Sequence, residues 1–173
     1  MGRVAARLRT YWQMEAFNVV LLPAMVSFLV WVYEGTPTLA LAAALIANAV
    51  LLVIGACYWR IVFLRIKGDP RPFERWLPRL AATEPYALAL TMLTVAVTAF
   101  DLATGGGTWP AERIAATAMT TLAVLEYVNY YRVQLQYFDH APDFAALLKR
   151  KTLKRAHMAR DIADWRAKSR ERG

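Results

Sequence analysis

One acidic side chain stands inside an otherwise apolar stretch of this sequence, with other polar groups at helical spacing around it. Glu126 lies in the run 114–132, which is apolar apart from a few polar positions. At 100° per residue, Glu126 shares an arc of about 140° with five further polar side chains. These five are Asn129, Arg132, Gln136, Asp139 and His140. A carboxyl group inside such a run can accept a proton, hold a cationic group or accept hydrogen bonds from a neighbouring helix.

Two interpretations of this polar face stay open. In the first, Glu126, Asn129, Tyr130 and Arg132 form a pocket that faces the cytoplasm and binds a polar or cationic group. In the second, Glu126 and Asn129 clamp their helix to a neighbour through hydrogen bonds. We do not expect an unpaired Glu126 to face lipid, since a charged side chain near mid-membrane costs roughly 2.5–3.5 kcal/mol on insertion scales.

A stripe of hydroxyl groups is the expected partner of this face. Thr91, Thr94, Thr98 and Asp101 follow i, i+3, i+7, i+10 spacing and share one side of a helix. Threonine hydroxyls can bond back to helix carbonyls and let neighbouring helices approach closely, so we expect packing rather than a substrate-lined wall. The spacing of Ala40, Ala44 and Asn48 likewise predicts a helix-association face.

Basic side chains gather in two other segments, and both suggest contact with anionic lipid. One segment, 65–85, contains four prolines and cannot form one straight helix, so we expect a kinked interfacial stretch there. The other follows Pro142 and predicts a charged amphipathic helix. The expected headgroup-binding residues are Arg71, Arg75, Arg79, Lys149, Arg150, Lys151, Lys154 and Arg155. Nucleic acid is not expected as a partner, because a position beside the membrane explains the charge and no base-reading module is present.

The elements that must position these groups are membrane-spanning helices. Of the 173 residues, 58% are hydrophobic and 20% are charged, and the charges are segregated from four apolar runs. A span needs about 20 mostly apolar residues. We therefore predict an all-α polytopic membrane protein, a four-helix transmembrane bundle over 1–140 followed by a basic cytoplasmic tail helix within 141–173. The four expected helices cover about 16–33, 39–64, 85–102 and 113–138, the third being capped by Thr83 or Glu84.

The distribution of charge also predicts how the chain is threaded. Segments 34–38 and 103–112 contain no lysine or arginine, whereas all basic residues except Arg113 fall on the other side of the expected spans. The positive-inside rule then places both termini in the cytoplasm. A helical bundle rich in alanine and arginine suggests a bacterial inner (plasma) membrane.

The residue inventory excludes several membrane chemistries. The only histidines are His140 and His157, and Cys57 is the only cysteine. Haem ligation across helices, a histidine cluster for di-iron and quinone-linked thiol oxidation are therefore not expected. No metal site and no cofactor are expected.

Three functional hypotheses remain. The first is a non-enzymatic assembly subunit that associates with itself or with another membrane protein and contacts anionic lipid. The second is a lipid- or amphiphile-binding, or lipid-modifying, protein with a pocket around Glu126 at the cytoplasmic leaflet. The third is an ion or small-cation pathway in which Glu126 titrates. The packing stripes favour the first.

Overall fold

The computed structural model describes residues 2–135 and 154–171, and the regular structure in these two ranges is helical. The helices in chain order are α1 (Gly2–Val32), α2 (Leu39–Ile66), α3 (Arg71–Thr104), α4 (Ala111–Tyr131) and α6 (His157–Arg170). The expected all-α class is confirmed for this part of the chain. Six predicted site residues lie outside the described residues: Gln136, Asp139, His140, Lys149, Arg150 and Lys151.

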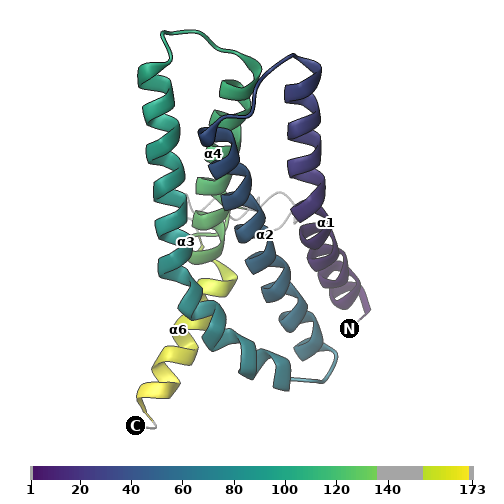
Figure 1. The fold of residues 1–173 in the computed structure, drawn as a ribbon. Coiled ribbons are helices and arrows are strands. Elements are labelled where there is room, and N and C mark those ends of the chain that lie inside the picture. Colours follow the sequence, from purple (N-terminus) through teal and green to yellow (C-terminus); the bar gives the residue numbers. More distant parts are fainter. Residues whose placement is uncertain (1, 136–153, 172–173) are drawn as a thin grey trace, which may run out of the picture.

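The first four helices run up and down beside one another, and both described chain ends lie at the same end of the bundle (Figure 1). We call this end, which holds residues 65–75, Arg132 and α6, the basic end. The opposite end holds the connections 33–38 and 105–110, and we call it the loop end (Figure 1).

Three helices are long and apolar enough to cross a membrane, namely Val4–Val32 within α1, α2 and α3. The chain is therefore consistent with a membrane protein. The helix expected as the fourth span, α4, does not reach the same hydropathy. Glu126, Asn129 and the tyrosines near its end lower it.

The second helix is the centre of the bundle. Half of its apolar window is buried within the chain, against 6% for α1 and 22% for α3. The predicted association face of α2 is confirmed, because Ala40, Ala44 and Asn48 are all buried. The Asn48 Nδ2 donates to the Met119 carbonyl of α4 at 2.7 Å and to the Ala44 carbonyl at 2.8 Å. This amide therefore fixes the register of α2 against α4.

The first helix begins at Gly2 rather than at about residue 16. No proline or glycine stands between residues 2 and 23, so nothing stops the helix where the apolar run begins. The extension also packs: Leu8 is buried, and the Tyr11 ring lies 5.7 Å from that of Trp59 on α2.

The third helix begins at Arg71, not at Pro85, and continues through Pro78 and Pro85. The predicted cap at Thr83 is wrong. Its hydroxyl donates to the Leu80 carbonyl, and also bonds the Tyr131 hydroxyl, at 2.8 Å in each case. The predicted departure from a straight helix is visible, since the ribbon of α3 changes direction between its two halves (Figure 1). Proline removes one backbone hydrogen bond and bends a helix without necessarily ending it.

The fourth helix ends at Tyr131, seven residues before the predicted end. Beyond it the backbone pairs with the tail: the Gln134 N–H donates to the Lys154 carbonyl at 2.9 Å, and the Ala156 N–H donates to the Arg132 carbonyl at 3.1 Å. The described tail helix starts only at His157. The apolar members of α6, Met158 and Ile162, are buried against the protein, whereas we expected them to face lipid.

Candidate functional site

A pair of carboxyl groups lies where α1 and α4 face each other. Tyr130 on α4 donates from its hydroxyl to Glu15 Oε2 on α1 at 2.9 Å. Glu126 stands one helical turn before Tyr130 and therefore lies on the same face of α4. Glu126 Oε2 is buried and accepts no hydrogen bond from the described residues. Glu15 and Glu126, which we call the carboxyl pair, thus bring two acidic groups together in a largely apolar region.

Tyr130 reaches Glu15 because the intervening helix leaves room for its ring. Gly55 of α2 is buried, and a Cβ built on it would lie 2.6 Å from Tyr130 Cζ. No real side chain tolerates such a separation. Glycine at this position therefore lets the Tyr130 ring, which is 4% exposed, pass against the α2 backbone.

The partners predicted for Glu126 on its own helix are used elsewhere. Asn129 Oδ1 accepts from the Leu135 N–H at 2.8 Å and so holds the chain where it leaves α4. Arg132 donates to Glu84 Oε1 at 3.0 Å and to the Tyr127 hydroxyl at 3.1 Å. The expected hydrogen bonds from Glu126 and Asn129 to a neighbouring helix do not occur among the hydrogen bonds of the described residues. The predicted polar face of this helix does not extend to Arg132, because α4 ends at Tyr131.

The threonine stripe of α3 is buried and packs against α2 and α4. Thr98 bonds the Thr120 hydroxyl of α4 at 2.8 Å, and Thr94 donates to the Leu90 carbonyl at 2.9 Å. Thr91 donates to the Ala87 carbonyl at 2.8 Å. These contacts agree with the packing interpretation of the stripe.

Asp101, the last member of that stripe, lies at the loop end. It pairs with Arg113 Nε at 3.0 Å, and Arg113 also donates to the carbonyls of Gly105 and Thr108. Arg113 and Glu126 are thirteen residues apart on α4, which is about 20 Å along a helix. The structure therefore does not bring Asp101 into a common pocket with Glu126.

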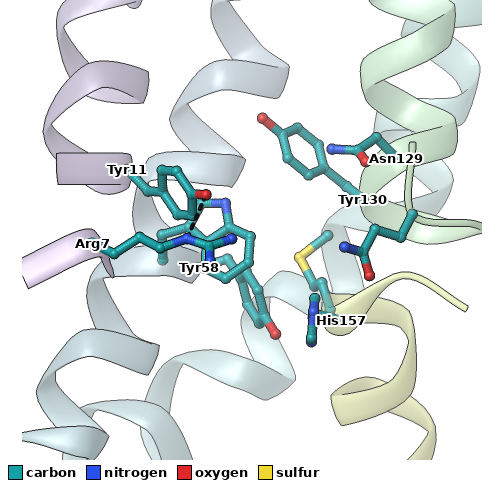
Figure 2. A pocket seen from close by; sticks show the side chains of 9 residues that line it. Arg7, Tyr11, Tyr58, Asn129, Tyr130 and His157 are labelled. Atoms are coloured by element: carbon teal, nitrogen blue, oxygen red, sulfur yellow. Dashed lines mark hydrogen bonds between the residues drawn. The ribbon is translucent and has the colours of Figure 1, made fainter. Parts of the chain in front are cut away.

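A small polar cavity lies beside the carboxyl pair at the basic end. Its volume is about 50 Å³, room for a few water molecules. Figure 2 shows that α1, α2, α4 and α6 all contribute to its wall. Arg7, Tyr58, Asn129, Tyr130 and His157 are among the lining residues. Tyr130 lines this cavity and also bonds Glu15, so it connects the two features.

A second polar cluster holds α6 on the bundle. The Tyr58 hydroxyl of α2 donates to Asp161 Oδ2 at 2.7 Å, and Arg65 Nη2 lies 3.9 Å from the same oxygen. The Arg65 guanidinium sits 3.8 Å from the centroid of the Phe73 ring. Sequence reasoning missed both Asp161 and Glu15. The one hint of Glu15 was an acid among the basic residues that precede the first apolar run.

The described members of the headgroup-binding set lie on exposed surface. Arg71, Arg75 and Arg79 occupy the first three turns of α3, where Arg71 pairs with Asp69 at 3.1 Å. Lys154 and Arg155 are exposed just before α6. Their binding to lipid stays a prediction.

An apolar groove of about 550 Å³ separates α1 from α4 toward the loop end. Val26, Leu29 and Tyr33 line it from α1, and Ile114 and Met119 line it from α4. The groove and the carboxyl pair therefore lie along the same side of α4, facing α1.

No group of three or more histidine, cysteine, aspartate or glutamate side chains placed to hold a metal occurs in the part of the chain that the structure describes. The chain matches none of the known protein families, characterised proteins or solved structures with which it was compared.

Proposed function

We propose that α4 also crosses the membrane, so that the chain has four spans and both termini face the cytoplasm from the plasma (inner) membrane. A helix of 21 residues is about 31 Å long, close to the thickness of the hydrocarbon layer. The polar groups that lower its hydropathy are covered, since Tyr127 and Tyr130 are buried and Glu126 faces α1. Basic residues at one end of the bundle support this orientation.

Within that arrangement, we propose that the protein is a non-enzymatic assembly subunit whose α1 packs against a second copy of the chain. The observation that carries this is the exposure of α1, which packs along α2 but of whose apolar window only 6% is buried. Ala16, Ala24 and Ser27 are exposed and lie within an arc of about 80° on this helix. Small residues on one face allow two membrane helices to approach closely.

Cysteine cross-linking in the native membrane tests this assembly. Ser27→Cys in a Cys57→Ser background should give a cross-linked dimer with a short bifunctional maleimide. When an epitope-tagged form of this variant is coexpressed with an excess of untagged protein, fewer tagged chains should be cross-linked to one another. Met92→Cys, also exposed but on α3, is the matched control and should give little dimer. Equal yields at both positions, or a monomer from Ser27→Cys, would contradict assembly through α1.

We further propose that the basic end binds anionic lipid through the exposed arginines of α3. Each basic residue beside an anionic surface contributes about 1 kcal/mol, so three neighbouring arginines provide substantial attraction. Replacing Arg71, Arg75 and Arg79 together by glutamine should reduce the anionic lipid that copurifies. Unchanged lipid content would contradict this part of the proposal.

A second candidate function is favoured by the carboxyl pair. Two carboxyl groups beside an apolar groove suit an amphiphile whose cationic head lies at Glu15 and Glu126 and whose tail lies between α1 and α4. Glu126→Gln would then fold normally and lose the bound amphiphile. If Glu126 only packs between helices, Glu126→Gln should keep both the fold and the bound amphiphile. Loss of cation flux in proteoliposomes with no change in bound amphiphile would instead favour the ion pathway.

A further inference from the structure

A larger cavity opens at the basic end, where α2 ends, α3 begins and α6 packs across both. Its volume is about 510 Å³, within the usual range for small-molecule sites. Unlike the groove near the loop end, this cavity has both charged and apolar walls. The charged lining residues are Arg65, Glu74, Asp161, Asp164 and Lys168.

Arg65 presents hydrogen-bond donors to this cavity in a fixed position. Its guanidinium is stacked 3.8 Å from the Phe73 ring centroid, which restricts how it can turn. Its only ion pair within the described residues is the contact with Asp161 at 3.9 Å. A guanidinium has five N–H donors in a planar fork that matches the oxygens of a phosphate. Most of these donors stay available to a ligand.

Lys168 on α6 adds a second positive charge to the same cavity. It forms no ion pair within the described residues. Two cations on neighbouring elements, one of them a held guanidinium, suit an anionic group with oxygens that can accept from both, such as the two free oxygens of a phosphate diester.

Two carboxylates lie in the same wall and restrict the chemical class of the ligand further. Glu74 on α3 and Asp164 on α6 make no ion pair in the described part of the chain, whereas Asp161 is occupied by Tyr58 and Arg65. Carboxylates beside a phosphate site repel a ligand that is only negative. They attract one that carries a positive group next to its phosphate.

The apolar lining indicates that the ligand is an amphiphile. Phe73, Leu77 and Trp165 line the cavity between the charged groups. Tryptophan and arginine at the end of an apolar span stand at headgroup level in a membrane. A glycerol backbone and the first acyl carbons fit such walls.

We propose that this cavity binds a zwitterionic phospholipid whose phosphodiester carries a primary amine, that is, an ethanolamine phospholipid. Its phosphate contacts Arg65 and Lys168, and its ammonium contacts Glu74 and Asp164. The proposal rests on the membrane insertion of the bundle proposed above, but not on its assembly or on the exposed arginines of α3.

Native mass spectrometry of the full chain tests the site. The delipidated protein, in which glutamine replaces Arg71, Arg75 and Arg79 so that these exposed residues retain no anionic lipid, is mixed in detergent with equal amounts of dioleoyl phosphatidylethanolamine, phosphatidylglycerol and phosphatidylcholine. We expect the ethanolamine lipid to be retained about tenfold over the other two, because the glycerol lipid lacks a cation and the choline lipid has no N–H donors. Equal retention, or preference for phosphatidylglycerol, would overturn the proposal.

Substitutions test the phosphate-binding and the ammonium-binding residues of the site separately. Lys168→Gln should lower retention of the ethanolamine lipid about tenfold, and Glu74→Gln with Asp164→Asn should abolish its preference over phosphatidylglycerol. Lys67→Gln removes the same charge from an exposed position near the cavity but outside its wall, and should change neither. If all of these variants retain the ethanolamine lipid equally and with the same preference over phosphatidylglycerol, the cavity does not select the lipid. Arg65→Gln is the weaker test, since it also removes the stack on Phe73 that supports the fold.

A soluble ligand separates a lipid site from a site for free phosphate esters. Glycerophosphoethanolamine at tenfold excess should not displace the lipid, because it lacks the acyl chains. Displacement would overturn the lipid assignment. Failure of the cross-linking or of the anionic-lipid experiment, with ethanolamine lipid still bound, would refute the proposed assembly function and leave this site standing.

Discussion

Replacing Gly55 by alanine should destabilise the bundle, although alanine is the better helix former. Gly55 lies in the middle of α2, buried against the ring of Tyr130. An alanine Cβ would lie 2.6 Å from Tyr130 Cζ and 3.1 Å from Cε1. The first separation is shorter than carbon atoms tolerate and the second is tighter than most such contacts, so the ring or the helix must move.

The size of the effect follows from three contributions. At an open helical position, glycine to alanine stabilises by roughly 0.5–1 kcal/mol. Overpacking a closed site costs typically about 1–3 kcal/mol. Moving the ring would also break the bond from Tyr130 to Glu15, worth about 1 kcal/mol. The clash outweighs the helix preference, and we expect Gly55→Ala to lower the free energy of unfolding by about 1–3 kcal/mol.

A double-mutant cycle, measured by unfolding in mild detergent, isolates the clash from other effects. In a Tyr130→Leu background the ring is gone, and Gly55→Ala should then be neutral or stabilising. The coupling between the two positions should be about 1–3 kcal/mol. If Gly55→Ala stabilises the protein equally in both backgrounds, the Tyr130 ring is not seated against α2 and the path to Glu15 is wrong.

Three further predictions concern topology, packing and the tail. A cysteine that replaces Thr36 should react with an impermeant maleimide in spheroplasts, and one that replaces Ser169 should react only after lysis, because basic residues favour the cytoplasm. Labelling at position 169 in intact spheroplasts would contradict the proposed orientation. Asn48→Leu should lower the unfolding free energy by about 1–2 kcal/mol, since its amide bonds a carbonyl of α4; an unchanged melting temperature would deny that bond a stabilising role. Glu84→Gln should raise protease cleavage near α6, because its two oxygens accept from an arginine after α4 and another on α6. Unchanged cleavage would mean that these half-exposed pairs do not hold the tail.

The apolar helices and the central packing face could be predicted from sequence because they depend on local pattern. An apolar run long enough to span a bilayer is visible without knowledge of its neighbours. The Ala40, Ala44 and Asn48 spacing predicts a close helix contact, and Asn48 does bond α4. The threonine stripe is likewise buried against its neighbours.

The positions where helices end could not be predicted in the same way. Proline within α3 and the absence of any breaker before the first apolar run both allow helices to continue beyond the spans. The fourth helix stops early because Asn129 accepts from the Leu135 N–H and residues 132–134 pair with 154–156. The two backbone pairs join residues 20 and 24 positions apart, and no periodicity encodes them.

The tail helix emerges as the element that organises the basic end. It is tied to α2 through Asp161 and Tyr58, and to α3 through Arg166, which donates to Glu84 Oε2 at 3.1 Å. Arg132, at the end of α4, donates to the other oxygen of Glu84 at 3.0 Å. One carboxylate therefore joins the ends of two helices to a third. A change that releases α6 would open the larger cavity lined by Arg65 and the small cavity beside Tyr130 together, because α6 lines both. A ligand bound between α2, α3 and α6 would accordingly stabilise the arrangement in which α6 is packed on the bundle.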